Sequence, residues 1–386
     1  MRLLRSIRSV NPAGGGPIEG IKQVARVHKA AGHDTEIVSL DAPEDAWVKE
    51  CPVKVHAMGP VRSGYGYAAK FTPWLAEHRK EYDAVIVSGL WQYSGLGVWR
   101  ALRRTDTPYF VFPHGMLDPW FKRTYPLKHL KKWLYWPWAD YRMLRDARAV
   151  LFTSEEERTA ARESFWLYRC NEIVVNYGIA APTGDAAAQK HAVLQRFPEL
   201  AGKRAFVFLS RIHEKKGCDL LIRAFAKIAP ADPSLRLVFA GPDQTGLVSG
   251  LRALSGQLGI ADRIVWTGML TGDLKWGMLH LAEAFVLPSH QENFGIAVAE
   301  ALACGTPVLI SNKVNIWREI EQDGAGLVDE DDEAGTTRLL QKWLALSVAE
   351  KDAMRKISHQ CFQSRFEVTR AAEAIITAIQ TKPGLA

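Results

Sequence analysis

Features that mark several common classes of protein are scarce in this sequence. Its 386 residues include five cysteines, with no C-x-x-C pair and no histidine at the spacing of a zinc site. Scattered thiols of this kind indicate a protein kept reduced in the cytosol. No apolar run approaches the ~18 residues that cross a bilayer, and arginines interrupt the apolar amino terminus, so we expect no signal peptide. The sequence therefore predicts a cytoplasmic protein and leaves open whether it lies peripherally on the inner face of the cell membrane.

Acidic residues are fewer than basic residues in the first half of the chain only. Residues 1–180 hold 26 Lys and Arg against 19 Asp and Glu, whereas residues 181–386 hold 23 of each. This asymmetry predicts an anionic partner for the first half, with membrane headgroups, a phosphorylated substrate and nucleic acid as candidates. The length exceeds one ordinary core and fits two domains.

Two series of strands alternating with helices are expected along the chain. The first series opens with a strand at 2–9, a glycine-rich turn at 11–17, a helix at 18–31 and a strand at 35–40, which form a parallel unit with a right-handed crossover. Its further strands are expected at 84–88, 109–112 and 149–153. The second series is expected to have strands at 205–209, 235–240, 264–267, 284–287 and 308–311, with helices at 219–228, 247–258 and 273–281.

The strands of the second series are nearly continuous apolar runs, as in sheets that are covered on both faces. The sequence thus predicts an α/β protein of two doubly wound, Rossmann-like domains that face each other across a cleft, where a ligand would bind at the carboxyl ends of the strands. We place the domains at residues 1–180 and 181–364, joined near 180–189, where the composition shifts to Ala, Pro, Gly and Thr. A last helix at about 365–386 has no strand after it and is expected to pack on either domain, including back on the first.

The glycine cluster at 11–17 has two interpretations of equal weight, a phosphate-binding turn and a plain tight turn. Without side chains, Gly15 and Gly16 let the backbone approach a phosphate closely. A dinucleotide fingerprint would need a third glycine at the position of Glu19, and Asp41 stands near the place of a ribose-binding acid. An NAD-dependent oxidoreductase therefore stays open as an alternative.

The second half brings charged residues to predicted strand ends. Arg211 follows one buried strand and Lys216 comes five residues later, so two cations can converge on a diphosphate. Glu292 lies in the loop after another strand, and Glu300 stands eight residues further, inside the next helix. The free backbone N–H groups at the start of that helix, 293–296, suit phosphate or sugar oxygens.

These motifs resemble the retaining family-4 glycosyltransferases of GT-B fold over nearly the whole chain. The resemblance rests on Ser210-Arg211 with Lys216-Gly217, and on Glu292-x7-Glu300 within 288–308. It implies that Arg211 and Lys216 hold the donor diphosphate, Glu300 the ribose and Glu292 the hydroxyls of the transferred sugar. The other donor contacts that it implies are Gly15, Gly16, Met269 near the base, Asn293, Phe294, Gly295 and Ile296.

His114 follows the strand at 109–112, where this family often carries a histidine in the acceptor-side wall. A neutral imidazole can hydrogen-bond a sugar hydroxyl, so we predict a catalytic role for His114. We predict a catalytic role for Glu292 as well, because the resemblance places it on the hydroxyls of the transferred sugar. A covalent double displacement would need a carboxylate beneath the anomeric carbon. Since the resemblance assigns Glu292 to sugar hydroxyls, we expect attack on the leaving-group face, with a donor phosphate oxygen taking the acceptor proton.

We expect no metal and no other cofactor. Sugar transferases of the other common fold hold a divalent ion with Asp-x-Asp. The only dense acidic run here, 329–333, follows the key helix and is interpreted as a solvated surface. The cations Arg211 and Lys216 would then neutralise the leaving diphosphate in place of a metal.

The stretch 120–148 combines eight basic residues with eight Trp, Tyr and Phe side chains and leaves two interpretations open. It could lie at an anionic membrane surface, with aromatic rings at headgroup depth and Lys128, Lys131 and Lys132 on the lipid phosphates. It could equally pack the helix layer of the first domain. No recognised module supports nucleic-acid binding, which we do not expect.

The sequence as a whole predicts a retaining hexosyltransferase. Its partners would be a nucleotide-diphosphate sugar, for which a GDP-linked, mannose-like donor is a guess, and a saccharide or lipid-linked saccharide acceptor. The expected setting is surface polysaccharide or lipopolysaccharide biosynthesis. A non-catalytic nucleotide-sugar sensor on the same fold and the oxidoreductase are the alternatives.

Overall fold

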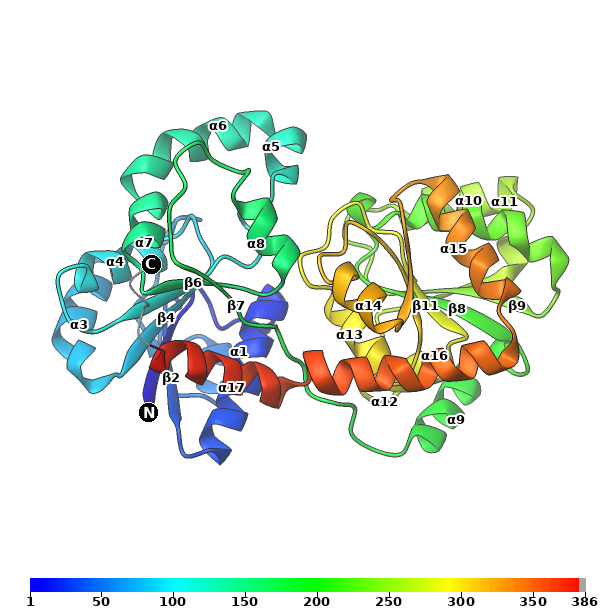
Figure 1. Ribbon diagram of the computed structural model, residues 1–386, viewed down its shortest axis with the longest axis horizontal. Helices are drawn as coiled ribbons and strands as arrows, with labels where there is room; N and C mark the ends of the chain where they lie inside the picture. The colour runs from blue at the N-terminus through cyan, green and yellow to red at the C-terminus, as the bar shows by residue number, and fades with distance from the viewer. Residues whose placement is uncertain (382–386) are drawn as a thin grey trace. The chain divides into compact units, whose positions relative to one another are not determined.

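The computed structural model describes residues 1–381, which divide into two compact units (Figure 1). One unit holds Met1–Gly178 together with the chain from Val368 onward, and the other holds Ile179–Glu367. Each unit is a parallel sheet with helices on both faces. The predicted pair of Rossmann-like α/β domains is therefore confirmed.

The first unit contains a seven-stranded sheet in the order β3-β2-β1-β4-β5-β6-β7, with every pair parallel. Its strands are β1 (Arg2–Ser6), β2 (Asp34–Ser39), β3 (Val55–Ala57), β4 (Ala84–Ser88), β5 (Tyr109–Phe112), β6 (Ala149–Phe152) and β7 (Glu172–Val174). The edge strands β3 and β7 were not predicted. Each has three residues that are only partly buried, so neither gives the apolar run by which a central strand is recognised.

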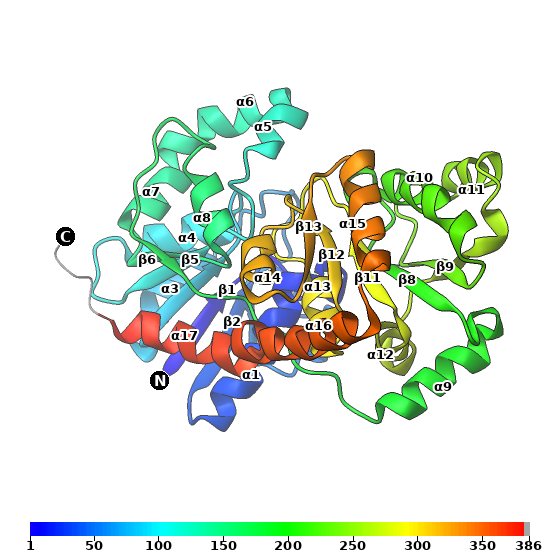
Figure 2. The ribbon, with the colours of Figure 1, turned by 45° about the vertical axis from the view of Figure 1, so that its right-hand side comes forward.

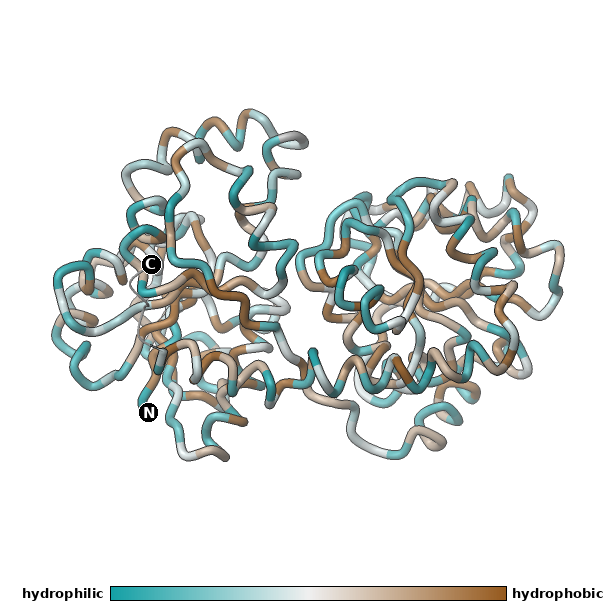
Figure 3. Tube along the Cα trace, in the orientation of Figure 1, coloured by the Kyte–Doolittle hydropathy of each residue, from teal (hydrophilic) through white to brown (hydrophobic). Residues whose placement is uncertain are grey.

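Helices cover both faces of this sheet. They are α1 (Gly16–Ala30), α2 (Ala46–Lys49), α3 (Phe71–His78), α4 (Tyr93–Leu102), α5 (Trp120–Thr124), α6 (Pro126–Tyr135), α7 (Asp140–Asp146), α8 (Glu155–Ala161) and α17 (Val368–Gln380). One core cluster joins Val85 and Val87 of β4 to α3, α4 and α7, and a second joins Ile37 of β2 to Ile18 and Ile21 of α1. The strands are the most hydrophobic part of the trace (Figure 3).

The second unit contains a six-stranded parallel sheet in the order β10-β9-β8-β11-β12-β13. Its strands are β8 (Arg204–Leu209), β9 (Leu235–Ala240), β10 (Ile264–Gly268), β11 (Ala284–Leu287), β12 (Val308–Ser311) and β13 (Gly326–Asp329). The five predicted strands are all present. The sequence missed β13, an edge strand of four residues of which three are only partly buried.

Helices α10 and α15 pack together on one face of this sheet, and α9 and α12 on the other (Figures 1 and 2). The helices of the unit are α9 (Ala186–Arg196), α10 (Cys218–Ile228), α11 (Val248–Gln257), α12 (Gly272–Leu281), α13 (Ile296–Ala303), α14 (Trp317–Asp323), α15 (Glu333–Ala345) and α16 (Val348–Cys361). Helix α9 begins inside the predicted connection at 180–189. The side chain of Asp185 caps it by accepting from Ala188 N at 2.7 Å, and the alanines that suggested a linker are strong helix formers.

The carboxyl-terminal helix α17 belongs to the first unit and contacts α1. Nε2 of His28 on α1 hydrogen-bonds the carbonyl oxygen of Ala372 at 3.2 Å. A π-helical turn, Phe362–Phe366, ends the second unit just before it. The predicted helix extended to residue 386, and its last five positions lie outside the described residues.

Gly20 on α1 lies against the side chain of Tyr177. A Cβ at this position would lie 1.8 Å from the hydroxyl oxygen of Tyr177. That hydroxyl donates to the carbonyl oxygen of Gly16 at 2.6 Å, so it is not free to swing away. We expect Gly20→Ala to lower the free energy of unfolding by about 1–3 kcal/mol through overpacking. Chemical denaturation measures this directly.

Gly250→Ala is the matched control for that experiment. Gly250 lies within α11, and a Cβ there would meet nothing within 4 Å. Alanine has the higher helix propensity, so this variant should be as stable as the wild type or more stable by up to about 1 kcal/mol. Equal stability of the two variants would contradict the steric role of Gly20.

Candidate functional site

Lys216 and Glu292 form a largely buried ion pair at the carboxyl edge of the second sheet. Lys216 ends the turn after β8, and Glu292 lies in the loop after the neighbouring strand β11. The ammonium group of Lys216 contacts Glu292 Oε2. Lys216 is only 5% exposed, and Glu292 lies beside its ammonium group as a partner of opposite charge. The loop of Glu292 is itself fixed, because Glu292 N donates to Lys313 O and Glu292 O accepts from Asn315 N, both at 3.0 Å.

Arg211 and Met269 line one cavity of about 320 Å³ at the same edge of the sheet. Arg211 follows β8 and is exposed, and its Nη1 donates to Gln244 Oε1 at 3.2 Å. Met269 follows β10 and is 70% exposed. The predicted cation and the predicted neighbour of the base are thus brought together, although Arg211 has a side-chain partner of its own.

Lys275, which the sequence did not single out, lines this cavity and pairs with Glu300. Its Nζ lies 2.6 Å from Glu300 Oε1 on α13, and 4.1 Å from the ring centroid of Trp276. Burial raises the pKa of Glu300, and the charge and hydrogen bond of Lys275 oppose that rise. Lys275 therefore favours the carboxylate form of Glu300. The sequence could have indicated Lys275 by its position, in the first turn of the helix that follows the loop predicted to lie near the base.

The start of α13 carries the remaining predicted donor contacts. Gly295 has φ 79° and caps the helix, which begins at Ile296. The side chain of Phe294 is 5% exposed and packs edge-on against Phe366, so only its backbone can face a ligand. Asn293 Oδ1 accepts from the side-chain amide of Asn315 at 3.4 Å.

In the first unit, Gly15 and Gly16 form the turn from a short 3₁₀ helix (Pro12–Gly14) into α1. Gly15 is exposed with φ 76°, a conformation open to glycine, and Gly16 is the first residue of α1. The N–H groups that begin a helix of this length carry a partial positive charge. The geometry therefore suits an anion at this turn.

His114 follows β5 with a φ of 51°, which is uncommon for a residue with a side chain. Its ring stacks on Phe112, with 5.4 Å between ring centroids. Burial, followed by the charge of Arg5, lowers the pKa of His114 to about 3. The imidazole is thus neutral at physiological pH.

Two other interpretations change with the structure in hand. Asp41, the ribose-binding acid of the oxidoreductase alternative, accepts from Ser9 Oγ at 2.5 Å, from Val10 N at 2.8 Å and from Trp47 Nε1 at 3.0 Å. Asp41 is therefore engaged in hydrogen bonds that hold the loop after β1. The acidic run at 329–333 was interpreted as a solvated surface, and Glu330 and Asp332 are exposed. Asp329 differs, because its side chain is only 10% exposed and pairs with Arg338 and Lys342.

The basic, aromatic stretch 120–148 divides into a packed and an exposed part. Trp136 is fully buried and stacks on Phe165, with 4.4 Å between centroids. Helix α6 has no buried residue, and its exposed large side chains are Leu127, Leu130, Trp133 and Leu134. Within residues 1–381, no helix is both long and apolar enough to cross a membrane.

Both halves of the chain match family models. Residues 15–178 match "Glycosyl transferase 4-like domain" and residues 192–360 match "Glycosyl transferases group 1". A D-inositol 3-phosphate glycosyltransferase of Thermomonospora curvata is 36% identical over 145 residues, which are 35% of this chain and 33% of that relative. The matched segment thus spans about a third of the relative's length.

Solved structures resemble the chain over its whole length. The Anabaena protein HepE, in complex with UDP-glucose, superposes with a TM-score of 0.76 at 16% identity, covering 98% of this chain and 99% of that one. WaaG, a glycosyltransferase involved in lipopolysaccharide biosynthesis, superposes with a TM-score of 0.63 at 15% identity, covering 98% and 100%. At these identities the likeness is one of fold.

Two Rossmann-like units, one of which carries paired acids and cations at the carboxyl edge of its sheet, have the GT-B architecture of the solved glycosyltransferases that the chain resembles. The two family models together match most of the sequence and identify the family of the chain. The chain belongs to the family-4 glycosyltransferases, as its motifs had indicated.

Proposed function

We propose that the chain transfers a sugar from a nucleotide-diphosphate donor to an acceptor hydroxyl with retention of the anomeric configuration. The buried Lys216–Glu292 pair carries this proposal. A cation held in a dry site beside a carboxylate can neutralise a leaving diphosphate while the carboxylate accepts from sugar hydroxyls. The donor nucleotide would lie in the cavity of Arg211, Met269 and Lys275, with its ribose on Glu300.

The chemistry assigned to these residues is same-face displacement. The bond from the anomeric carbon to the donor phosphate oxygen breaks, the acceptor oxygen bonds to that carbon on the same face, and the acceptor proton passes to a phosphate oxygen. Lys216 and Arg211 would stabilise the charge that grows on the diphosphate. Glu292 would orient the sugar and His114, as a neutral imidazole, would hydrogen-bond a hydroxyl. Gly15 and Gly16 remain proposed phosphate contacts of the first unit.

The donor base and the acceptor are proposed from the comparisons alone. The UDP-glucose complex of HepE supports a uridine diphosphate donor, while the GDP-linked, mannose-like donor stays a prediction. The role of WaaG supports surface polysaccharide or lipopolysaccharide biosynthesis as the setting. The relative that acts on D-inositol 3-phosphate supports a phosphorylated acceptor as the alternative.

Ligand-induced thermal stabilisation tests the proposal first. UDP, GDP, ADP and NAD are compared at equal concentration, and the matching nucleotide sugar is then assayed for nucleotide release with and without saccharide acceptors. Stabilisation by one nucleoside diphosphate together with turnover is expected. Stabilisation by NAD alone would favour the oxidoreductase, and binding without any turnover would favour the sensor.

Turnover is expected to be the same in excess EDTA as in untreated buffer. The physical reason is that Lys216 and Arg211 supply the positive charge that a divalent ion supplies in Asp-x-Asp enzymes. The measurement is the rate of nucleotide release after dialysis against chelator. Activity that disappears in EDTA and returns with magnesium would contradict metal-independent transfer.

We also propose that α6 attaches the protein to an anionic membrane surface. The helix exposes 78% of Leu127, 61% of Leu134 and 42% of Trp133. Lys128 and Lys131 are exposed on the same short helix, so apolar side chains and cations meet on one element, as in interfacial helices. A lipid-linked acceptor would be found at such a surface.

Sedimentation with vesicles tests this attachment. The protein should sediment with vesicles that contain phosphatidylglycerol, and Leu127→Asp should weaken binding at least about tenfold, because it replaces a leucine that would be buried in lipid by a charge. Val348→Asp is the control, since Val348 is 76% exposed on α16 in the second unit. Equal binding of the two variants, or no binding by the wild type, would contradict the proposal.

A further inference from the structure

Arg5 is a buried arginine that has no acidic partner among the residues that the structure describes. It lies in the interior strand β1 and is 5% exposed. Its guanidinium carbon stands 5.4 Å from the ring centroid of Phe112. In the described part of the chain, neither Nε nor Nη1 of Arg5 has a hydrogen-bond acceptor. Charged groups inside proteins are normally paired, because desolvation is otherwise uncompensated.

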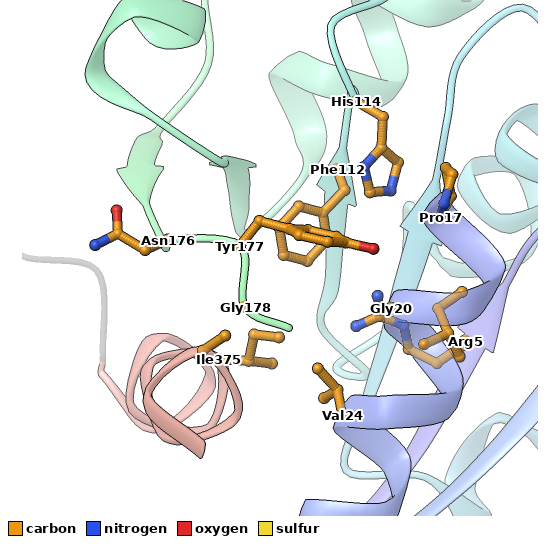
Figure 4. Close-up of a pocket in the computed structure, with 12 residues that line it drawn as sticks. Arg5, Pro17, Gly20, Val24, Phe112, His114, Asn176, Tyr177, Gly178 and Ile375 are labelled. Carbon is orange, nitrogen blue, oxygen red and sulfur yellow. The ribbon is translucent and has the colours of Figure 1, made fainter. Parts of the chain in front are cut away.

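These nitrogens lie beside a small cavity of the first unit (Figure 4). Its walls come from Phe112, His114, Tyr177 and the helices α1 and α17, and its volume is about 20 Å³, which is room for one water-sized particle. His114 also lines it, and the buried Nε2 of His114 has no partner among residues 1–381. Three nitrogen atoms without a hydrogen-bond partner among the described residues therefore belong to two residues that line one cavity.

Arg5 supplies the positive charge at this cavity. Burial lowers the pKa of Arg5 to about 10, a value at which it stays charged at physiological pH. Burial lowers the pKa of His28 to about 4, and the charge of Arg5 contributes to that shift as it does for His114. The phenol of Tyr177 has a raised pKa and donates to Gly16 O, so it supplies no negative charge.

We propose that this cavity is a binding site for a halide-sized monovalent anion, held by Nε and Nη1 of Arg5 and by Nε2 of His114. A water molecule would accept two of these hydrogen bonds but would leave the guanidinium charge uncompensated. A chloride ion accepts all three and provides the missing charge. Bound there, it would also fix the tautomer of His114 that carries its proton on Nε2.

Thermal unfolding of the wild type in chloride or bromide, compared with gluconate at equal ionic strength, tests the site. A saturable rise in melting temperature of a few degrees is expected with the halides. Arg5→Met should abolish the rise and should be at least as stable as the wild type in gluconate, because no buried charge is left unpaired. Arg104→Met, at an exposed arginine of the same unit, should keep the rise.

Diffraction from wild-type crystals soaked in bromide tests the anion site even if Arg5→Met does not fold. An anomalous bromine peak between the guanidinium of Arg5 and Nε2 of His114 is expected. No peak there, or a halide effect on melting that Arg5→Met retains in full, would overturn the anion site. A water molecule at that position in both gluconate and bromide would do the same.

Discussion

Lys216→Met is expected to lower kcat/KM for the nucleotide sugar by about 10²–10³-fold, the usual effect of removing one donor to a developing negative charge. The 5% exposure of Lys216 and its contact with Glu292 place its ammonium group where water cannot replace it. Methionine keeps the length and apolar stem of lysine, so packing is preserved while the charge is lost. Steady-state release of the nucleoside diphosphate measures the loss.

Two companion variants make this result specific. Lys227→Met removes a half-exposed lysine of α10 that pairs with Glu333, and its activity should equal that of the wild type. The double variant Lys216→Met/Glu292→Gln should lose far less than the product of the two single losses, because paired residues act as a unit. A folded Lys216→Met protein with wild-type turnover would show that the pair only supports the fold.

Glu300→Gln is expected to raise the KM for the nucleotide sugar by about 10- to 100-fold with little change in kcat. A hydrogen bond to a charged group contributes about 1.5–3 kcal/mol, and a ribose contact is the same in the ground state and the transition state, so its loss appears in KM. Lys275, 2.6 Å from Glu300, favours the charged form on which the effect depends. Initial rates over a range of donor concentrations separate the two constants.

A donor analogue without ribose hydroxyls tests whether loss of the ribose contact causes the rise in KM. With that analogue, Glu300→Gln and the wild type should have the same KM, because neither can make the contact. Glu321→Gln, at an exposed carboxylate on α14, should leave the KM for the natural donor unchanged. If the variant lost affinity equally for both donors, Glu300 would not bind ribose.

Much of the fold follows from local sequence. The interior strands of both sheets have four to six residues that are mostly buried, and the sequence located all of them. It missed β3, β7 and β13, whose residues are mostly half-buried at sheet edges, where the apolar pattern is weak. Composition alone also misassigned the start of α9, because alanine suits a linker and a helix alike.

Charged residues that follow strands are the part of the candidate site that position in the chain predicts most directly. Arg211, Lys216 and Glu292 stand in loops after strands, and position in the chain predicts their place at the sheet edge. Lys275 reaches Glu300 from another helix, a neighbourhood that no local pattern encodes. Arg5 is a lone arginine within an apolar strand, and the sequence does not tell whether such a residue has a partner.

The return of α17 to the first unit has a consequence for synthesis on the ribosome. Every segment of the second unit is translated before Val368, so that unit can complete its core while the first still lacks a helix. The side chains of α17 that face α1, Ala371 and Ile375 among them, emerge last. The domain that is begun first is therefore finished last, and a chain released early would expose the apolar face of α1.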